Sequence, residues 1–293
     1  MDLEHSIGEL KRRFGIRTDT KDVKSIFGGN INRAFCLSTD SESLFVKINA
    51  ARALSFFEAE ADGLEALRTA EGVSVPEIVD VGCAGEISYL ALRWIEFSSK
   101  TKSAEHLLGM ALAQQHRDTA EQFGWYRENT IGATPQRNTF MCNWSDFFQL
   151  ERLGVQLELA AKRGLPQQQL DQAHYVMERL EWFFAGREPV ASLLHGDLWS
   201  GNWGCDASGK PFIYDPAVYY GDREADLAMT RLFGGFGDAF YSAYQNEWPL
   251  TDGWEARVDL YNLYHLLNHF NLFGASYLDQ TSDTLSRLCN FVR

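Results

Sequence analysis

The sequence predicts an α+β fold in two unequal lobes: a small N-terminal lobe with an antiparallel sheet plus a helix, and a larger, mainly helical C-terminal lobe. Runs rich in β-branched and aromatic residues occupy much of residues 23–49 and 78–95, a pattern typical of strands. From residue 102 onward, helical patterns dominate. A chain of 293 residues also exceeds what one small core requires. We therefore expect the lobes to comprise residues 1–95 and 96–293.

The N-terminal lobe is expected to begin with a helix over residues 3–13 and to contain a second helix over residues 54–70. Its strands are expected over residues 23–27, 34–37, 44–48, 78–81 and 88–95. The composition turns polar at residues 96–103, where the connection between the lobes should lie.

The C-terminal lobe is expected to contain helices over residues 102–122, 142–163 and 167–185, and to be helical again over 222–293. A loop with Gly132, Pro135 and Gln136 separates the first two helices. Further along, residues 203–205 and 211–214 have the pattern of a hairpin.

Composition and charge exclude several classes of protein. Hydrophobic residues make up 45% of the chain and charged residues 23%, as in ordinary globular proteins. The net charge of −13 argues against a broad surface for nucleic acid or for an anionic membrane. We find no apolar run long enough to span a membrane and no signal-peptide pattern at the start. Five scattered cysteines are expected to be reduced thiols, so a cytoplasmic protein is expected.

The segment most informative about function runs over residues 193–203. Asp197 follows a His–Gly pair, and Asn202 stands five positions after it. This H-x-D-L-x-x-x-N spacing is that of a kinase catalytic loop, in which the acid accepts the proton of the attacking hydroxyl and the amide holds a metal ion. A second acid, Asp215, ends a β-rich run downstream. A polar turn after a buried strand is the alternative for the His–Gly–Asp alone. We expect Asp197 to be catalytic and Asn202 and Asp215 to bind Mg²⁺.

Lys47 and Glu60 are the expected charged pair of the N-terminal lobe. Lys47 lies inside an apolar strand, where it either reaches out at an edge or serves a buried anion. Glu60 falls on the apolar face of the following helix, where an unpaired carboxylate is costly. We expect the two to form the ion pair that positions the phosphates in kinases, unless Glu60 only borders the apolar face. Three acids on the other face of that helix are expected to face solvent: Glu58, Asp62 and Glu65.

Two further stretches are expected to contact ATP. Gly28, Gly29 and Asn30 stand between the first two strands, where a glycine pair lets backbone N–H groups approach phosphates. Hairpin turns use the same residues, so the pair by itself leaves both interpretations open. Backbone groups near Arg93 and Ile95, at the end of the last strand of the small lobe, are expected to bond the adenine edge.

His265 and His269 are four positions apart in a helical run and could share a metal ion. The zinc-protease pattern requires a Glu directly after the first His, and Leu266 stands there instead. We therefore expect a packed or pocket-lining pair.

With these residues in place, the chain resembles the kinase-like phosphotransferases that include aminoglycoside and choline kinases. Within that group it is similar to the fructosamine kinase (ketosamine 3-kinase) family over nearly its whole length. The similar segments are residues 57–60, 129–136, 195–202, 215–228 and 267–269. The resemblance implies a bilobal protein-kinase-like fold and ATP-dependent phosphorylation of the sugar 3-hydroxyl of a ketoamine, with Mg²⁺ as cofactor. Breakdown of the phosphorylated adduct would then free the amine, which is deglycation.

The resemblance also suggests roles for single residues. Trp199, directly after the His–Gly–Asp–Leu core, is expected to form a wall for the sugar or the amine, and His269 to line the substrate site. His195 and Asp226 are expected to support the catalytic loop. The implied substrates are fructosamine, ribulosamine or erythrulosamine adducts, on small molecules and on glycated proteins. The preferred sugar and the oligomeric state are left open.

Two residues depart from the family pattern. The family often has a cysteine linked to redox control in the phosphate loop, where this chain has Asn30, so the resemblance does not extend to a redox switch, and whether any redox regulation exists is left open. Gln115 stands where a leucine is common.

Other functions compete with this interpretation. One is another small-molecule kinase of the same fold, of the aminoglycoside or choline type. A regulated protein kinase is disfavoured, because only nine positions separate Asp215 from Glu224, too few for a long activation segment. A nucleotide-binding scaffold without catalysis has no need of both Asp197 and Asn202.

Overall fold

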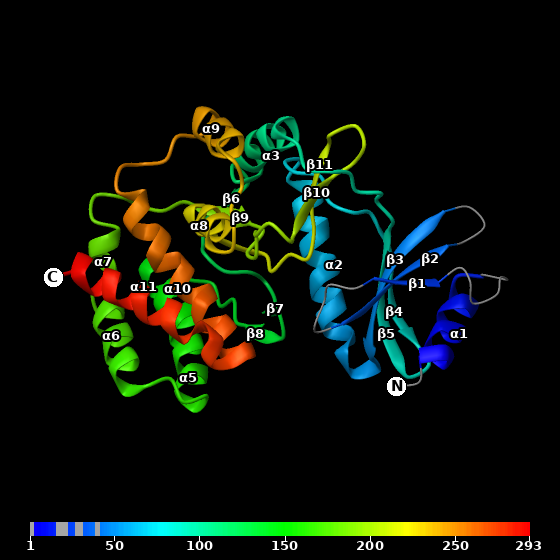
Figure 1. Ribbon diagram of the computed structural model, residues 1–293, viewed down its shortest axis with the longest axis horizontal. Helices are drawn as coiled ribbons and strands as arrows, with labels where there is room; N and C mark the ends of the chain where they lie inside the picture. The colour runs from blue at the N-terminus through cyan, green and yellow to red at the C-terminus, as the bar shows by residue number, and fades with distance from the viewer. Residues whose placement is uncertain (1–2, 16–22, 27–31, 39–41) are drawn as a thin grey trace.

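The computed structural model describes residues 3–15, 23–26, 32–38 and 42–293 and shows the two expected lobes (Figure 1). The smaller lobe contains helix α1 (Leu3–Arg13) and a five-stranded antiparallel sheet in the order β1-β2-β3-β5-β4. Its strands are β1 (Val23–Ile26), β2 (Arg33–Ser38), β3 (Ser43–Ala50), β4 (Ile78–Ala84) and β5 (Ile87–Arg93). The expected sheet and its helices are confirmed. Chain order and sheet order differ at β4 and β5, because β5 pairs with both β3 and β4.

Strand alternation decides which side chains of β3 meet which helix. Leu44, Val46 and Ile48 are buried on one face of the sheet, in a cluster that includes Leu10 of α1. On the opposite face, Leu90 and Leu92 of β5 pack against helix α2 (Leu54–Thr69). Lys47 alternates with the buried residues of β3 and is therefore on the α2 face. A short 3₁₀ turn (Ala51–Ala53) joins β3 to α2.

Helix α2 contacts both lobes (Figure 1). A Cβ added to Gly63 would lie 3.1 Å from a methyl group of Val218, so the helix fits closely against the large lobe. The expectation that Glu58, Asp62 and Glu65 simply face solvent is wrong for Asp62 alone, since the side chains of Glu58 and Glu65 are 47% and 53% exposed. Asp62 forms an ion pair with Arg127 of the large lobe, and Glu58 lies 3.9 Å from the same guanidinium. Helical periodicity correctly identified the acidic face of α2, but it could not show that Arg127 of the large lobe lies beside that face.

The chain enters the large lobe after β5. Helix α3 (Lys102–Gln115) begins at Thr101, whose hydroxyl accepts a 3.1 Å hydrogen bond from the Ala104 amide. The helix ends at Gln115, not at residue 122 as expected. Thr119–Ala120 instead form β6, which pairs with β9 (Ala191–Leu194). This pairing joins segments far apart in the chain, so it could not be predicted from the local sequence.

That sheet is the base of the catalytic loop. β9 lies between β6 and β12 (Tyr219–Asp222), and all four residues of β9 are buried. The expected hairpin is confirmed as β10 (Trp203–Cys205) and β11 (Pro211–Ile213). The loop expected around residues 132–136 is a second hairpin, β7 (Asn129–Ile131) and β8 (Thr134–Gln136).

Helices make up most of the remainder of the large lobe. The helix expected over 142–163 is α4 (Trp144–Phe147), a π-helical segment (Phe148–Gly154) and α5 (Val155–Lys162). The one expected over 167–185 divides into α6 (Gln167–Met177) and α7 (Leu180–Phe183). The C-terminal helices are α8 (Glu224–Leu232), α9 (Asp238–Glu247), α10 (Trp254–Phe273) and α11 (Leu278–Phe291), with a 3₁₀ turn (Gly274–Tyr277) between the last two.

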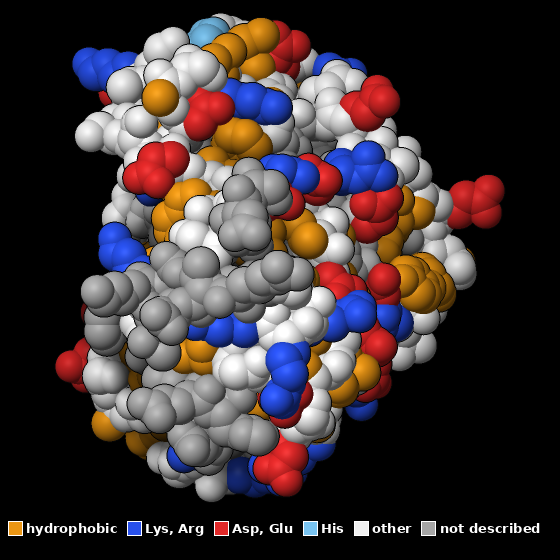
Figure 2. Space-filling view, turned by 90° about the vertical axis from the view of Figure 1, so that its right-hand side faces the viewer, with side chains coloured by type: hydrophobic (Ala, Val, Ile, Leu, Met, Phe, Trp, Pro, Cys, Tyr) orange, Lys and Arg blue, Asp and Glu red, His pale blue; other side chains and the backbone are white. Residues whose placement is uncertain are grey.

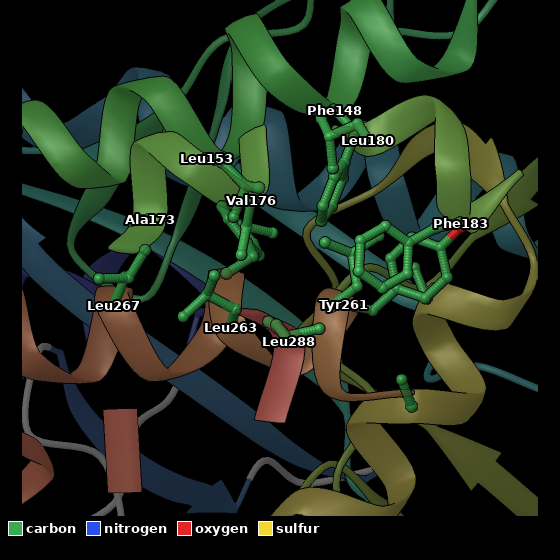
Figure 3. Packing of buried hydrophobic residues seen from close by; sticks show 14 of the residues in the cluster. Phe148, Leu153, Ala173, Val176, Leu180, Phe183, Tyr261, Leu263, Leu267 and Leu288 are labelled. Atoms are coloured by element: carbon green, nitrogen blue, oxygen red, sulfur yellow. The ribbon is translucent and has the colours of Figure 1, made fainter. Parts of the chain in front are cut away.

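The main core of the large lobe forms around α10 (Figure 3). Leu263 and Leu267 of α10 belong to the same buried cluster as Val176 of α6 and Leu288 of α11. Leu194 of β9 belongs to it as well, so the start of the catalytic loop is anchored in this core. Burying such side chains contributes about 1.5–3 kcal/mol each.

A network of buried charges joins β12 and α8 to α10. Arg257 donates to Glu224 at 2.6 and 3.0 Å, and Arg187 donates to Asp222 at 2.7 Å and lies 3.2 Å from Glu224. Tyr261 also donates to Asp222. Two cations and two anions balance, as burial requires. These acids of the 215–228 segment therefore have a structural role.

The surface of the small lobe has mixed charge. On the face shown in Figure 2, Lys and Arg side chains are interspersed with Asp and Glu side chains among the described residues that are visible. Arg93, for example, pairs with Glu42 and Glu77. Among the described residues, no helix is both long and apolar enough to cross a membrane. All five cysteines are free thiols, as expected.

Candidate active site

The catalytic loop follows β9 and turns sharply at Gly196. This residue has φ of +83°, and a Cβ there would lie 2.1 Å from the carbonyl oxygen of Ala217. Only glycine fits such a position. The turn is what allows a buried strand to lead directly into the half-buried Asp197.

Asp226 of α8 supports the loop through its backbone. Its carboxylate accepts hydrogen bonds from the amide of His195 at 2.7 Å and from the amide of Gly196 at 2.8 Å. His116 lies at 3.2 Å on the same carboxylate. Burial opposes ionisation of Asp226, but the hydrogen bonds from His116 and from the Gly196 amide help to outweigh it, and its pKa is lowered. The ionised carboxylate of Asp226 therefore holds the backbone of the catalytic loop in place.

His195 joins the catalytic loop to the segment that carries Asp215. One ring nitrogen, Nε2, lies 3.0 Å from the carbonyl oxygen of Tyr214, and Nδ1 accepts from the Asp197 amide at 3.2 Å. Nε2 must then carry the proton and donate to Tyr214. Burial lowers the pKa of His195, which keeps this tautomer neutral. His195 and Asp226 thus both form hydrogen bonds with the backbone in and around the catalytic loop, which is compatible with the support expected of them.

Lys47, Glu60 and Asp215 form a charged triad across the two lobes. The ammonium nitrogen of Lys47 lies 2.7 Å from Glu60 and 2.7 Å from Asp215. The expected Lys47–Glu60 pair is present, and the contact with Asp215 is additional. Burial opposes the charge on Lys47, but the charges of Asp215 and Glu60 outweigh it and raise its pKa. The cation is therefore permanently charged where phosphates would approach.

Asp197 and Asn202 are in direct contact. The amide nitrogen of Asn202 donates to the Asp197 carbonyl at 2.9 Å and to its carboxylate at 3.2 Å. Tyr214 donates its amide to the Asn202 carbonyl at 3.0 Å, which places Asp215 next to the loop. Burial, followed by the negative charge of Asp215, raises the pKa of Asp197 to about 7. This value suits a group that must accept a proton near neutral pH.

The acceptor atoms available here suit Mg²⁺. Asp215 has φ of +59°, an uncommon conformation for a residue other than glycine, and its side chain is 44% exposed. The hydrogen bonds of the Asn202 side chain to described residues are made by its amide nitrogen and not by its oxygen. A carboxylate and an amide oxygen are ligands that Mg²⁺ prefers. The donor set therefore fits the expected ion, which Asn202 and Asp215 would hold.

The expected nucleotide contacts are placed only in part. Gly28, Gly29 and Asn30 lie outside the described residues. The amide of Arg93 donates to Glu77 at 2.8 Å, and its guanidinium binds Glu77 and Glu42. An adenine contact would therefore fall to the Arg93 carbonyl and to the backbone of Ile95, just beyond the end of β5.

The two histidines of α10 are packed, as expected. His265 is 4% exposed, and burial lowers its pKa to about 3. His269 lies 2.8 Å from the His265 carbonyl through Nδ1. Among the described residues, no group of three or more His, Cys, Asp and Glu side chains could hold a metal ion. His269 and Trp199 both contact Phe233, so the two expected substrate residues are linked through one ring.

Sequence reasoning missed two residues that support this site. Arg127 ties α2 to the large lobe, and His116 pairs with Asp226 while contacting the Tyr244 hydroxyl at 2.8 Å. Neither residue belongs to a sequence motif whose spacing indicates a catalytic or binding role. His116 follows directly after Gln115, a departure that drew attention to this position without indicating its partner.

Comparison with known proteins identifies the family. The profile of the fructosamine kinase family matches residues 3–291. The chain is 44% identical over 268 residues to the "probable ketoamine kinase" of Synechocystis sp., covering 91% of this chain and 90% of the relative. It is 41% identical over 282 residues to the chloroplastic protein-ribulosamine 3-kinase of Oryza sativa subsp. japonica, covering 95% and 81%.

Solved structures agree with this assignment. A protein from Haemophilus somnus 129PT, provisionally named fructosamine-3-kinase, superimposes with a TM-score of 0.87 at 29% identity, covering 97% of each chain. An aminoglycoside phosphotransferase, APH(4)-Ia, crystallised as a mutant with ADP and hygromycin B, has a TM-score of 0.65 at 16% identity, covering 97% and 96%. This second likeness shows the fold, which is kinase-like. The chain belongs to the fructosamine kinase family and is an ATP-dependent kinase.

Proposed function

We propose that this protein phosphorylates the sugar 3-hydroxyl of ketosamines at the expense of ATP. The observation that supports this best is the convergence of two groups in a chain of this family. Asp197 and Asn202 lie on one loop, and Lys47, Glu60 and Asp215 form a triad beside it. The first group can handle a hydroxyl proton, and the second can hold phosphates.

In this proposal Asp197 receives the proton of the acceptor hydroxyl as its oxygen attacks the γ-phosphorus. The bond from that phosphorus to the bridging oxygen breaks, and ADP leaves with the electron pair. Asn202 holds the Asp197 carboxylate in place through its 3.2 Å hydrogen bond. Positioning of this kind and electrostatic stabilisation supply most of the rate in phosphoryl transfer.

The nucleotide would lie between the lobes, with Lys47 on its phosphates and its adenine at Arg93 and Ile95. Gly28, Gly29 and Asn30 are proposed to cover the phosphates. Mg²⁺, when bound by Asp215 and Asn202, would neutralise charge that develops on the phosphate oxygens. Glu60 keeps Lys47 oriented through their 2.7 Å contact.

The proposed substrates are fructosamine, ribulosamine or erythrulosamine adducts of small amines and of proteins. Relatives named ketoamine kinase and protein-ribulosamine 3-kinase support this class. A phosphate on O3 is a good leaving group two carbons from the nitrogen-bearing carbon. After enolisation of the ketone toward that carbon the phosphate can be eliminated, and hydrolysis of the resulting imine by water then releases the amine. The proposal therefore includes deglycation. A cytoplasmic location and a lobe boundary at residues 95 and 96 remain predictions.

The decisive test measures ADP formation by the purified protein with Mg·ATP. Synthetic ribulosyl, fructosyl and erythrulosyl amines should support turnover, and the product should carry phosphate on O3 by NMR. Kanamycin and choline are the comparison substrates, because they represent the rival kinase classes. Turnover of either one, with all three ketoamines unphosphorylated, would show the proposal to be wrong. A protein that binds ATP without turning over any acceptor would instead be a scaffold.

A further inference from the structure

A row of aromatic rings begins at the catalytic loop and continues to the junction of α10 and α11. We call it the aromatic strip; it consists of Trp199, Phe233, His269, Phe273 and Tyr277. Ring centroids are 6.4 Å apart between Trp199 and Phe233, and 4.6 Å apart between Phe233 and His269. His269 and Tyr277 are 5.0 Å apart, and Tyr277 and Phe273 are 6.0 Å apart. These spacings are those of interacting aromatic pairs, so the strip is continuous.

The strip lies at the edge of the main hydrophobic core, against which Tyr277 packs. Phe273 is 48% exposed, and the other four rings are partly exposed. They come from three separate segments: the catalytic loop, the end of α8 and the α10–α11 junction. In Figure 1, that junction lies at the end of α10 nearer to the small lobe. Five rings from distant segments thus share one accessible surface.

The strip starts beside the proposed reaction centre. Trp199 is two positions after Asp197, and its indole lies against Gly201, where an added Cβ would be 2.3 Å from the ring. The absence of a side chain at Gly201 therefore leaves room for the indole on the loop that carries Asp197. A substrate whose hydroxyl reaches Asp197 must extend its remainder past this end of the strip or away from it.

The charge of the strip favours a cation. Nδ1 of His269 must carry a proton, because it lies 2.8 Å from the His265 carbonyl. Burial lowers the pKa of His269, so the ring is neutral and does not repel a positive charge. The amine nitrogen of a ketoamine is a secondary ammonium when protonated, and the faces of aromatic rings attract such ions.

We propose that the aromatic strip binds the amine side of the ketoamine. The ammonium lies against the ring faces nearest Trp199, and the substituent extends along Phe233, Tyr277 and Phe273. This deepens the proposed function and rests on it. The preferred substrates are then ketoamines of amines with long alkyl or aromatic chains, which includes the glycated side chain of lysine. Amines that carry a carboxylate on a short chain are disfavoured, because an anion is repelled by the ring faces.

The test uses three adducts of one sugar, ribulose, that differ only in the amine: methylamine, phenethylamine and β-alanine. We expect kcat/KM for the phenethylamine adduct to exceed that of the methylamine adduct by about tenfold, from added aromatic contact. The β-alanine adduct should be poorer than the methylamine adduct. The difference should appear mainly in KM, because the substituent does not touch the reacting atoms.

Phe273→Ala is the informative variant, since its exposed side chain can be removed without opening the core. We expect it to lower kcat/KM for the phenethylamine adduct by about three- to tenfold and to leave the methylamine adduct within about twofold. Phe291→Ala is the matched control, because Phe291 is 53% exposed and lies at the far end of α11. Phe291→Ala should leave kcat/KM unchanged for both adducts.

The outcomes separate this inference from the function on which it rests. Equal kcat/KM for all three adducts, or an unchanged substituent preference in Phe273→Ala, would overturn the aromatic strip as an amine site while leaving the kinase proposal intact. If the wild-type protein phosphorylates no ketoamine at all, the proposed function itself fails.

Discussion

Lys47 and Asp215 are 168 positions apart in the chain, yet the ammonium nitrogen of Lys47 lies 2.7 Å from a carboxylate oxygen of Asp215. The contact joins the small lobe to the large one at the proposed phosphate site. Glu60 completes the triad at the same distance from the ammonium. The ammonium of Lys47 is thus paired with two carboxylates, and phosphates entering the site would provide new partners for it.

Removing Asp215 tests the metal assignment. Asp215→Ala leaves the uncharged Asn202 as the only proposed protein ligand, so Mg²⁺-supported turnover should be abolished and Mg·ATP binding weakened. Calorimetry with ATP in the presence and absence of Mg²⁺ measures both effects. The exposed Asp252→Ala variant is the control for loss of one negative charge. Unchanged Mg·ATP affinity in Asp215→Ala would contradict the assignment.

Asp197→Asn tests the proton acceptor. The amide keeps the size of the side chain but cannot accept the hydroxyl proton, so kcat should fall by roughly 10²–10⁴-fold, the range for loss of a general base. ATP affinity should be largely kept, since Lys47 and Asp215 are untouched. Steady-state kinetics on a ribulosyl amine and nucleotide titration check the two expectations. Turnover close to that of the wild type would remove Asp197 from its assigned role.

Arg127→Ala tests whether the position of α2 depends on its contact with the large lobe. Arg127 binds Asp62 and lies near Glu58, both on the helix that carries Glu60. Without it, we expect α2 to be less firmly held and Lys47 less well oriented, with kcat/KM for ATP lowered about three- to thirtyfold, as for loss of a partly buried charge pair. A rise in KM for ATP should contribute most of the change.

A matched control lies on the same helix. Arg68 pairs with Glu65 on the exposed surface of α2, without any contact to the large lobe in that pair. Because exposed pairs contribute about 0–1 kcal/mol, Arg68→Ala should leave ATP kinetics unchanged. Partial recovery in Arg127→Lys would further support a role for charge. Equal kinetics for the Arg127 and Arg68 variants would show that α2 is held by packing alone, at Gly63 and Val218.

Gln115→Leu should stabilise the protein. Gln115 is fully buried, and neither atom of its side-chain amide has a hydrogen-bond partner among the described residues. An unsatisfied buried polar group costs about 1–3 kcal/mol, so an apolar replacement should raise the unfolding free energy by about 1–2 kcal/mol. The departure from the family pattern noted in the sequence thus has an energetic consequence. Chemical denaturation measures it.

The opposite result is expected for another buried glutamine. Gln156 accepts a 2.8 Å hydrogen bond from Asn271 and lies 3.4 Å from Asn268, so Gln156→Leu leaves amide groups without partners. It should lower the unfolding free energy by about 1–3 kcal/mol. If Gln115→Leu is as destabilising as Gln156→Leu, the premise that the Gln115 amide lacks hydrogen-bond partners is wrong.

Much of the site could be predicted because its signals are local. The spacing of Asp197 and Asn202 within one loop is set by the chemistry of phosphoryl transfer. The position of Lys47 inside an apolar strand suggested a buried partner, and helical periodicity put Glu60 on the apolar face of the following helix. The pairing of these two followed from the cost of burying either charge alone.

The missed features depend on contacts between distant segments. Residues 116–122 have helical composition, but α3 ends at Gln115 because Thr119 and Ala120 pair with β9. Asp62 was expected to face solvent because periodicity describes the faces of a helix and says nothing of what lies beyond them. Arg127, its partner, is a single arginine in a loop with no periodic pattern around it.

By itself, then, the sequence determined the order of most elements, the loop of residues 195–202 and the acids proposed to react, since each depends on residues close together in the chain. Only the tertiary structure decided that Asp215 meets Lys47, that His116 pairs with Asp226 and that Arg127 secures α2. It alone brought Trp199, Phe233 and Tyr277 into one strip. The physical reason is that these contacts form when whole elements pack against one another, and packing is set by the fit of many side chains together.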